Sequence, residues 1–599
     1  KAAPAHGFRF VPETGIPGTP GTESSAEASF SFTAIERASA RYGGALQAFG
    51  LKKGDRVALI LPTNEDFILC FFGAIRAGII PVPIYPPLGI GGLQAYLDNT
   101  RHIVEKSGAK VLVTNSKIKR LLGTVQAACP ALEQVVAVEA IRESMEPLKP
   151  VKVELDDVAF LQFTSGSTSR PKGVTLTHAS LGANMKAIME EGLQIREGDV
   201  GISWLPLFHD MGLIGFVLAP LMYKIPIVYM PSLLFLKRPV TWFQTISRHK
   251  GTIAYAPNFA YALCMKRIKE ADLEGLDLSS WRVAGCGAEP IRPETLEAFG
   301  NTFAKIGFDK KAFFPSYGMA ESSLAVAFDG IDKGFNALPV DGQTLWTEGK
   351  VKKVDEHAEG AIRLVSCGRP FKGHELAIFA PDDASSSKPL PEGTVGEIRI
   401  AGPSVMRGYW EDAEMTQQAF AGTFLRTGDL GFVQDGDVFI CGRSKEVVIV
   451  NGRNYYPQDM EWEASQVPGV RKGNVIAFGA QGTTSESDRE RVVLAFEIDA
   501  AAGSTPEGAQ QIQVAIRRAV QEGVGITLDD VVALPAGTLP KTSSGKLQRA
   551  KARAMYEAGE LVAGSGRNEG NTKMGLVKEA AKSQLSYLRL AVLGGRKKT

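Results

Sequence analysis

The chain has 599 residues, of which 44% are apolar and 22% charged, and a formal net charge of +2. This length exceeds what one hydrophobic core supports and predicts two to four domains of an ordinary soluble globular protein. A charge balance so close to neutral argues against nucleic-acid binding, which needs clustered excess Lys and Arg.

The six cysteines lie scattered without a C-x-x-C pair. Neither a zinc site nor a disulfide framework is therefore indicated, and a reducing cytoplasm is expected. The N-terminal residues lack the apolar segment of a signal peptide, so we read no targeting signal.

Predicted helices and strands alternate along most of the chain. After an irregular lead-in at residues 1–28, "SFTAIERASARYGGALQAFG" and "NEDFILCFFGAIRAG" have helical periodicity, whereas "DRVALIL" and "KVLVTN" are typical of short buried strands. The alternation continues through "PIVYM", "GTIAYA" and "WRVAGCGA". It predicts an α/β protein with largely parallel sheets.

From about Gly396 the pattern changes to short strands separated by DG and NG pairs, which mark hairpins. A smaller α/β unit follows, with the strands "NVIAFGA" and "RVVLAFEID" and the helical "GAQQIQVAIRRAVQEGV". We therefore expect an N-terminal domain over residues 29–443, a C-terminal domain over 444–563 and a basic tail over 564–599.

Two segments leave alternatives open. The apolar run Leu213–Leu236 contains three prolines, too many for a simple membrane-spanning helix. A buried helix, turn and strand, or the lining of a site for a long apolar ligand, fits it better.

The basic tail over residues 564–599 also leaves two interpretations open. Its sequence predicts either a helix docked on the protein's own surface or a contact with a partner or a membrane surface. Its apolar stripe is Val577, Ala581, Leu585, Leu588 and Val592.

The stretch "LQFTSGSTSRPKGVTLTH" at residues 161–178 is the first that indicates a ligand-binding site. It is not a Walker A loop, because Lys172 precedes its glycine instead of following it. It combines hydroxyl donors, a glycine that permits close backbone approach and a cation, which together predict a phosphate-binding site. An ordinary polar surface loop is the alternative. The candidate residues are Thr164, Ser165, Gly166, Ser167, Thr168 and Lys172.

Four further motifs follow in order: "YGMAE" (317–321), "RTGDLG" (426–431), "GRSKEVVIVNGRNYYPQDME" (442–461) and "PKTSSGK" (540–546). From about residue 30 to 560, this set resembles the adenylate-forming superfamily of acyl-CoA synthetases, peptide-synthetase adenylation domains and luciferases. The resemblance implies a large N-terminal domain of stacked α/β subdomains with a β-rich subdomain, and a small mobile C-terminal α+β domain. It also implies that a carboxylate attacks the α-phosphorus of ATP and that pyrophosphate departs.

The resemblance assigns roles to individual residues. The loop from Thr164 to Lys172 would hold the β- and γ-phosphates, and Glu321 would bind Mg²⁺, with Thr168 as a second candidate ligand. Lys546 would be the catalytic residue that bridges the substrate carboxylate and the α-phosphate, and Lys445 would be the interdomain hinge. Adenine and ribose would lie against Gly287, Ala288, Glu289, Ser316, Tyr317, Gly318, Met319, Asp429 and Arg443.

The nature of the acid is indicated by "LPLFHDMGLIG" at residues 205–215. Amino-acid-activating relatives have an Asp here that holds the substrate ammonium, whereas this chain has His209, followed by Asp210. An apolar acid is therefore favoured, although His209 is also compatible with a packed core residue. The expected acyl pocket consists of His209, Met211, Gly212 and Ile214.

The acceptor is indicated by "FTSGSTSRPKGV", "WLPLFHDMGLIG", "APNFAY", "DLSSWRVAGCGAEPIR" and "GRNYYPQDME", which are similar to the fatty acyl-AMP ligase branch. That branch carries an insertion, here at about residues 337–366, and passes its acyl group to the phosphopantetheine arm of an acyl carrier protein. We therefore expect a fatty acid and ATP as substrates and Mg²⁺ as a cofactor, within polyketide, lipopeptide or lipid biosynthesis. A fatty acyl-CoA synthetase and a catalytically silent acyl or nucleotide sensor are the alternatives.

Overall fold

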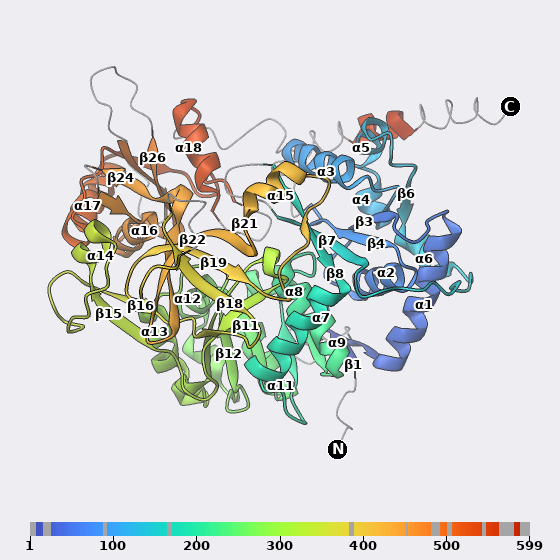
Figure 1. Cartoon of the computed structure of the whole chain (residues 1–599), viewed down its shortest axis with the longest axis horizontal. Coiled ribbons are helices and arrows are strands. Elements are labelled where there is room, and N and C mark those ends of the chain that lie inside the picture. Colours follow the sequence, from blue (N-terminus) through green and yellow to red (C-terminus); the bar gives the residue numbers. More distant parts are fainter. Residues whose placement is uncertain are drawn as a thin grey trace.

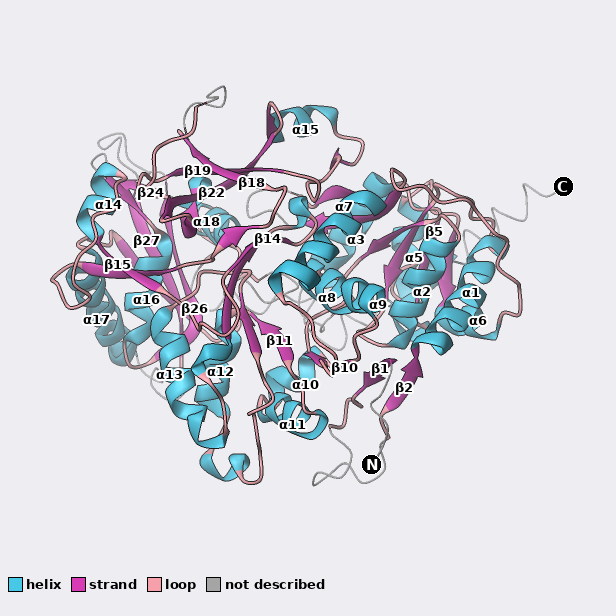
Figure 2. Ribbon diagram, turned by 60° about the horizontal axis from the view of Figure 1, so that its bottom comes forward, coloured by secondary structure: helices cyan, strands magenta, loops and turns pink. Residues whose placement is uncertain are grey.

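The computed structural model describes residues 7–15, 26–87, 93–164, 170–381, 388–450, 453–480, 491–499, 506–541, 547–561 and 580–587. The N-terminal elements, blue to cyan, lie at one end of the molecule, and the elements between residues 444 and 561, orange to red, lie toward the other (Figure 1). Helices and strands are interleaved throughout (Figure 2), so the predicted α/β class is confirmed.

The sheet nearest the N-terminus is parallel and contains the strands predicted from "DRVALIL" and "KVLVTN". Its order is β4–β3–β5–β6, and every neighbouring pair runs in parallel. Its strands are β3 (Arg56–Ile60), β4 (Ile80–Pro83), β5 (Val111–Thr114) and β6 (Gln134–Ala137). Its helices are α1 (Phe32–Ala48), α2 (Glu65–Arg76), α3 (Leu93–Ser107), α4 (Ser116–Lys119), α5 (Gly123–Ala128) and α6 (Val138–Glu143).

The longest sheet runs in the order β17–β14–β13–β12–β11–β9–β10–β1–β2. From β13 to β1 the neighbouring strands are parallel, and the strands outside them are antiparallel. The strands are β1 (Gly7–Phe10), β2 (Ala28–Ser31), β9 (Gly201–Ser203), β10 (Ile227–Tyr229), β11 (Ile253–Ala256), β12 (Val283–Cys286), β13 (Phe313–Gly318), β14 (Ala325–Phe328) and β17 (Arg369–Pro370). Helices α11 (Val240–His249), α12 (Asn258–Arg267) and α13 (Pro293–Phe303) connect or follow these strands.

The expectation of an irregular lead-in is wrong for residues 7–10, which form β1. The reason lies in two aromatic side chains of this strand. The rings of Phe8 and Phe10 pack against Tyr229 of β10, with centroid distances of 5.4 Å and 5.0 Å. Aromatic contacts of this kind stabilise a strand whose flanking sequence is rich in Gly and Pro.

A smaller antiparallel sheet has the order β20–β8–β7. Its strands are β7 (Val158–Thr164), β8 (Lys172–Thr177) and β20 (Gly408–Tyr409). Strands β7 and β8 form a hairpin that closes with Thr164 opposite Lys172. The predicted phosphate loop is therefore the connection between two paired strands.

The predicted β-rich region consists of β18 (Glu375–Phe379), β19 (Gly396–Ala401), β21 (Phe420–Ala421), β22 (Phe424–Gln434) and β23 (Asp437–Arg443). The unit that follows contains β24 (Val448–Val450), β25 (Arg453–Tyr455), β26 (Val470–Ala480), β27 (Arg491–Ile498) and β28 (Asp530–Leu534). Its helices are α16 (Pro457–Gln466), α17 (Pro506–Val524) and α18 (Arg549–Glu557). We call these elements, β24 to α18, the C-terminal unit.

The segment predicted as an insertion is folded. Strands β15 (Ala337–Asp341) and β16 (Ala361–Val365) pair in antiparallel fashion around α14 (Gly342–Glu348). Trp346 of α14 packs into the hydrophobic core of the C-terminal unit, and its ring lies 6.4 Å from that of Tyr455. The segment therefore bridges the N-terminal body and the C-terminal unit.

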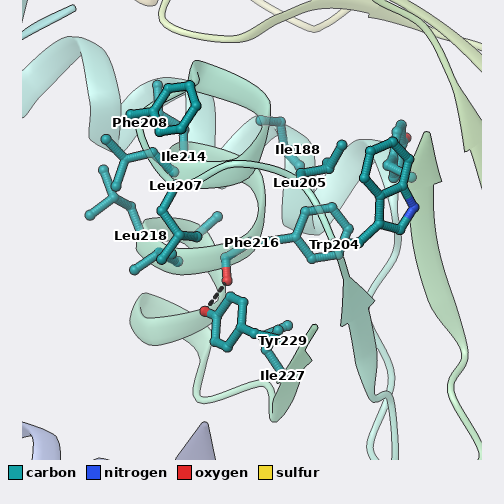
Figure 3. Packing of buried hydrophobic residues seen from close by; sticks show 14 of the residues in the cluster. Ile188, Trp204, Leu205, Leu207, Phe208, Ile214, Phe216, Leu218, Ile227 and Tyr229 are labelled. Atoms are coloured by element: carbon teal, nitrogen blue, oxygen red, sulfur yellow. Dashed lines mark hydrogen bonds between the residues drawn. The ribbon is translucent and has the colours of Figure 1, made fainter. Parts of the chain in front are cut away.

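The apolar run Leu213–Leu236 forms short elements: η2 (Ile214–Leu218), α9 (Ala219–Tyr223), β10 and most of α10 (Ser232–Lys237), after α8 (Asp210–Leu213). Figure 3 shows its packing, in which the Tyr229 hydroxyl donates a hydrogen bond to the Phe216 carbonyl oxygen, 2.6 Å away. Within the described ranges, no helix has both the length and the apolarity needed to cross a membrane.

Residues 580–587 of the tail form a helix that docks on the protein's own surface, as one interpretation of the sequence predicts. It lies beside α5, at the end of the molecule away from the C-terminal unit (Figure 1). The amide of Gly123 donates to the Ser583 hydroxyl at 2.7 Å, and the Tyr587 hydroxyl donates to the Lys119 carbonyl at 3.0 Å.

The stripe predicted for this helix is wrong within the described residues, because Ala581 and Leu585 are exposed and Ser583 is buried. The physical reason is the start of α5. The free amide of Gly123 needs an acceptor there, and the absence of a side chain lets the tail backbone come close. The Ser583 hydroxyl therefore faces α5, where the apolar stripe predicts a hydrophobic contact.

Replacing Gly123 with alanine should release the tail helix, since a Cβ at this position would lie 2.2 Å from the Ser583 carbonyl oxygen. We expect faster amide hydrogen exchange over residues 580–587 and faster tryptic cleavage after Lys582. Gly182→Ala is the control, because its Cβ would meet no atom within 4 Å. Unchanged protection of the tail in Gly123→Ala would contradict the docking.

Candidate active site

The predicted adenine-binding residues from Gly287 to Glu289 and from Ser316 to Gly318 lie at the carboxyl ends of two neighbouring parallel strands. Gly287, Ala288 and Glu289 follow β12, while Ser316 to Gly318 end β13. Because Cys286 pairs with Pro315, both segments leave the sheet at the same edge. A Cβ at Gly287 would lie 2.8 Å from the Ser316 carbonyl oxygen, so glycine permits this close approach.

The backbone after Gly287 is unusual. Ala288 adopts φ of +66°, in the left-handed region that residues with a side chain rarely occupy. The Glu289 carboxylate accepts a hydrogen bond from the amide of Phe259 at 2.6 Å, at the start of α12. The turn after β12 is therefore hydrogen-bonded to the start of α12, the helix that follows the neighbouring strand β11.

Tyr317, Asp429 and Arg443 form one hydrogen-bonded network. The Tyr317 hydroxyl donates to Asp429 Oδ2 at 2.7 Å, and Arg443 Nε lies 3.0 Å from Asp429 Oδ1. Asp429 and Arg443 are directly opposite each other in the β22–β23 pair. Burial raises the pKa of Tyr317 well above its usual range, and the neighbouring carboxylate adds to the shift, so the hydroxyl stays protonated as a donor.

Glu321 lies in the turn η6 (Ala320–Ser322), directly after β13. Its carboxylate accepts a hydrogen bond from the Tyr409 hydroxyl at 3.0 Å. Burial raises the pKa of this carboxyl and the nearby charge of Asp210 adds to the rise, while Tyr409 and Arg443 act in the opposite direction. The site thus holds a carboxylate whose charge is only partly compensated.

The described part of the phosphate loop consists of its two ends. Thr164 lines the cavity described below, and Lys172 Nζ lies 5.2 Å from the centre of the Tyr409 ring. Ser165, Gly166, Ser167 and Thr168 lie outside the described residues, as does Lys546. The segments that flank Lys546 are paired, since Lys541 forms a β-bridge with Leu547.

A cavity of about 2600 Å³ joins these groups to an apolar wall. Tyr317, Glu321 and Asp429 line its polar part. The expected acyl residues His209, Met211 and Gly212 also line it, whereas Ile214 is fully buried in the core behind them. Further apolar lining residues from the same region of the chain are Trp204, Phe216, Leu233, Leu234, Leu236 and Phe259.

His209 and Asp210 face each other at the entrance to α8. The imidazole Nδ1 is in close contact with the Asp210 carboxylate, which also accepts a hydrogen bond from the amide of Met211 at 2.7 Å. Asp210 is therefore held at the helix start. Apart from this pair, the side chains that residues 204–216 contribute to the cavity lining are apolar.

Lys445 lies in the turn η7 (Ser444–Glu446), between β23 and the C-terminal unit. The residue after it, Glu446, forms an ion pair with Arg549, whose guanidinium also pairs with Glu461 at 2.6 Å. Arg549 Nε donates to the Ala477 carbonyl at 2.8 Å. The start of α18, shortly after Lys546 in the sequence, is thus fixed to the turn that connects the two parts of the chain.

Sequence reasoning did not identify Arg292, which holds α16 of the C-terminal unit against the start of α13. Its guanidinium lies 3.2 Å from Asp459, donates to the Gln458 carbonyl at 2.6 Å and lies 5.4 Å from the centre of the Trp462 ring. The partners are more than 150 residues away, so the sequence gives no local signal for this contact.

Arg292→Ala should loosen the C-terminal unit in this pose. Loss of hydrogen bonds to a charged group costs about 1.5–3 kcal/mol and leaves the Asp459 carboxylate without its partner. We expect faster hydrogen exchange in α16. Arg518→Ala is the control, because its pair with Glu522 lies on the exposed face of α17. Equal exchange in the two variants would exclude a fastening role for Arg292.

Comparison with known proteins places the chain in a family. The AMP-binding enzyme family matches residues 18–410. The chain is 38% identical to a putative acyl-CoA synthetase of Caulobacter vibrioides, over 86% of this chain and 88% of the relative. It is 34% identical to the medium-chain-fatty-acid–[acyl-carrier-protein] ligase JamA of Moorena producens, over 85% and 87% of the two chains.

The fold has a close counterpart among solved structures. A structure from a study of fatty acyl-adenylate ligases from E. coli and L. pneumophila superposes with a TM-score of 0.85 at 34% identity, covering 93% of this chain and 96% of the other. The chain is therefore an AMP-binding enzyme with the adenylate-forming fold and belongs to the fatty acyl-AMP ligase branch of that superfamily.

Proposed function

We propose that this enzyme joins a fatty acid to AMP and then passes the acyl group to the phosphopantetheine arm of an acyl carrier protein. The observation that carries the proposal is the continuity of the cavity. One end holds the Tyr317–Asp429–Arg443 network, and the other is an apolar wall around Met211 and Phe216. A nucleotide and a long apolar acid would therefore meet in one space.

In the first step, a carboxylate oxygen attacks the α-phosphorus of ATP, the bond from that phosphorus to the bridging oxygen breaks, and pyrophosphate leaves. Asp429 would accept hydrogen bonds from the ribose hydroxyls, with Arg443 and Tyr317 holding its carboxylate in place. Lys172, with the loop after Thr164, would hold the β- and γ-phosphates. Lys546 would place its cation where negative charge develops between the two reactants.

Mg²⁺ fits the carboxylate at Glu321. This side chain is mostly buried, burial raises its pKa, and no ion pair with a described residue compensates its charge. Among the described residues, no cluster of three or more metal-binding side chains occurs. The Glu321 carboxylate would hold the cation, which would neutralise negative charge on the phosphates of ATP.

In the second step, the thiol of the carrier's phosphopantetheine arm attacks the acyl carbon, the bond to the phosphate oxygen breaks, and AMP leaves. The similarity to JamA supports a carrier protein as acceptor. The contact of α14 with the C-terminal unit, through Trp346 and Tyr455, gives the insertion a means of restricting how that unit moves about Lys445.

The test is mass spectrometry of products formed from a panel of fatty acids, ATP, CoA and a phosphopantetheinylated carrier protein. We expect acyl-AMP and pyrophosphate first, then acyl-carrier thioester, with little acyl-CoA. Efficient acyl-CoA formation would favour a CoA synthetase, which the name of the Caulobacter relative suggests for that protein. ATP binding without any adenylate would identify a silent sensor.

A further inference from the structure

Tyr409 contacts two groups that the proposed reaction uses. Its hydroxyl donates to Glu321 Oε1 at 3.0 Å, and its ring lies 5.2 Å from Lys172 Nζ. The tyrosine therefore stands between the cation of the phosphate loop and the carboxylate proposed for Mg²⁺. None of the five sequence motifs between Thr164 and Lys546 includes it.

The backbone fixes Tyr409 in this position from both sides. It belongs to β20, in which Tyr409 pairs with Val174 of β8, the strand that begins with Lys172. Trp410 donates its amide to the Gly173 carbonyl at 2.7 Å, and Met406 donates its amide to the Glu321 carbonyl at 2.8 Å. One short segment is thus hydrogen-bonded to the strand of Lys172 and to the turn of Glu321.

Electrostatics explains why an aromatic hydroxyl suits this place. A lysine and a glutamate that are both partly screened from water attract each other strongly, and a direct ion pair would occupy both groups. The structure contains no such ion pair among the described residues. Instead the ring face attracts the ammonium, and the hydroxyl satisfies one oxygen of the carboxylate.

We propose that Tyr409 is a positioning residue for Mg·ATP, which holds Lys172 and Glu321 apart and aims each at its own part of the ligand. Lys172 then stays available for phosphate oxygens, and Glu321 keeps a lone pair free for the metal. This inference rests on the proposed function for the identity of the ligand. The contacts that carry it belong to the protein alone.

The first test is calorimetric titration of Mg·ATP without any acid, so that no reaction follows binding. Tyr409→Phe keeps the ring and removes the hydroxyl, and we expect affinity to fall about tenfold, as for the loss of one hydrogen bond to a charged group. Tyr223→Phe is the matched control, because its hydroxyl donates to the Glu190 carboxylate at 2.8 Å on the protein surface. An equal affinity in the two variants would overturn the proposal.

A double-mutant cycle with Glu321→Gln separates positioning from a general loss of structure. If Tyr409 acts through Glu321, its removal should cost little further affinity once the carboxylate is gone. An undiminished effect of Tyr409→Phe in the Glu321→Gln background would show that the hydroxyl acts elsewhere. Melting temperatures measured for all variants confirm that each is folded.

Tyr409→Leu tests the role of the ring. This variant loses the contact with Lys172 as well, and we expect a larger loss of affinity than in Tyr409→Phe. An equal loss would show that the ring does not hold Lys172. Because these titrations need no acid, they decide the role of Tyr409 even if the product assay finds no acyl-adenylate, in which case only the proposed reaction fails.

Discussion

Lys546→Ala should reduce acyl-adenylate formation by roughly 10²–10³-fold, the usual cost of removing one preorganised group that stabilises developing charge. The attacking carboxylate and the α-phosphate are both anionic, so the barrier contains their repulsion, which a cation between them lowers. ATP binding should survive, because the phosphate loop and the ribose network are untouched. Single-turnover product analysis and calorimetric titration of ATP measure the two effects separately.

Lys551→Ala is the control for this experiment, since Lys551 lies exposed on α18, five residues further along. It removes the same charge from the same part of the chain, and its rate should equal that of the wild type. If the Lys546→Ala enzyme made acyl-AMP at an undiminished rate, the assignment of Lys546 as the catalytic residue would be wrong. A similar loss in both variants would indicate a long-range effect of charge instead.

The parts of the site that could be predicted from sequence are those whose geometry is local. Asp429 and Arg443 lie in consecutive strands joined by the DG turn at residues 435–436, so a hairpin brings them together, and they pair directly in the structure. Glu321 lies in the turn that follows the strand of Tyr317, only four residues further along. Short separation along the chain leaves little freedom in how such residues are placed.

The contacts that sequence could not predict join distant segments. Tyr409 reaches Glu321 across 88 residues, and Arg292 reaches Asp459 across 167. Neither residue stands in a pattern that distinguishes it from an ordinary strand or helix end. The docking face of the tail could not be predicted for a related reason: the donor that Ser583 satisfies, the Gly123 amide, belongs to α5, 460 residues earlier in the chain.

Asp429→Ala should lower kcat/KM for ATP roughly 10²–10⁴-fold, because about 1.5–3 kcal/mol is lost for each hydrogen bond to a charged acceptor and a ribose offers two hydroxyls. The loss should appear mainly in the KM for ATP, since ribose contacts are made equally before and during the reaction. The replacement also deprives the Tyr317 hydroxyl and Arg443 of the partner that orders them. Steady-state kinetics with varied ATP measures the split.

Asp437→Ala is the matched control, because Asp437 lies on the same β22–β23 hairpin. Its carboxylate forms an ion pair with Arg369 at 3.0 Å, the same distance as between Asp429 and Arg443. It should leave the KM for ATP unchanged. Tyr317→Phe should have an intermediate effect, since Asp429 keeps its charge and its contact with Arg443. If Asp429→Ala lowered kcat while the KM for ATP stayed constant, the carboxylate would act in the chemical step, and its place beside the ribose would have to be given to another residue.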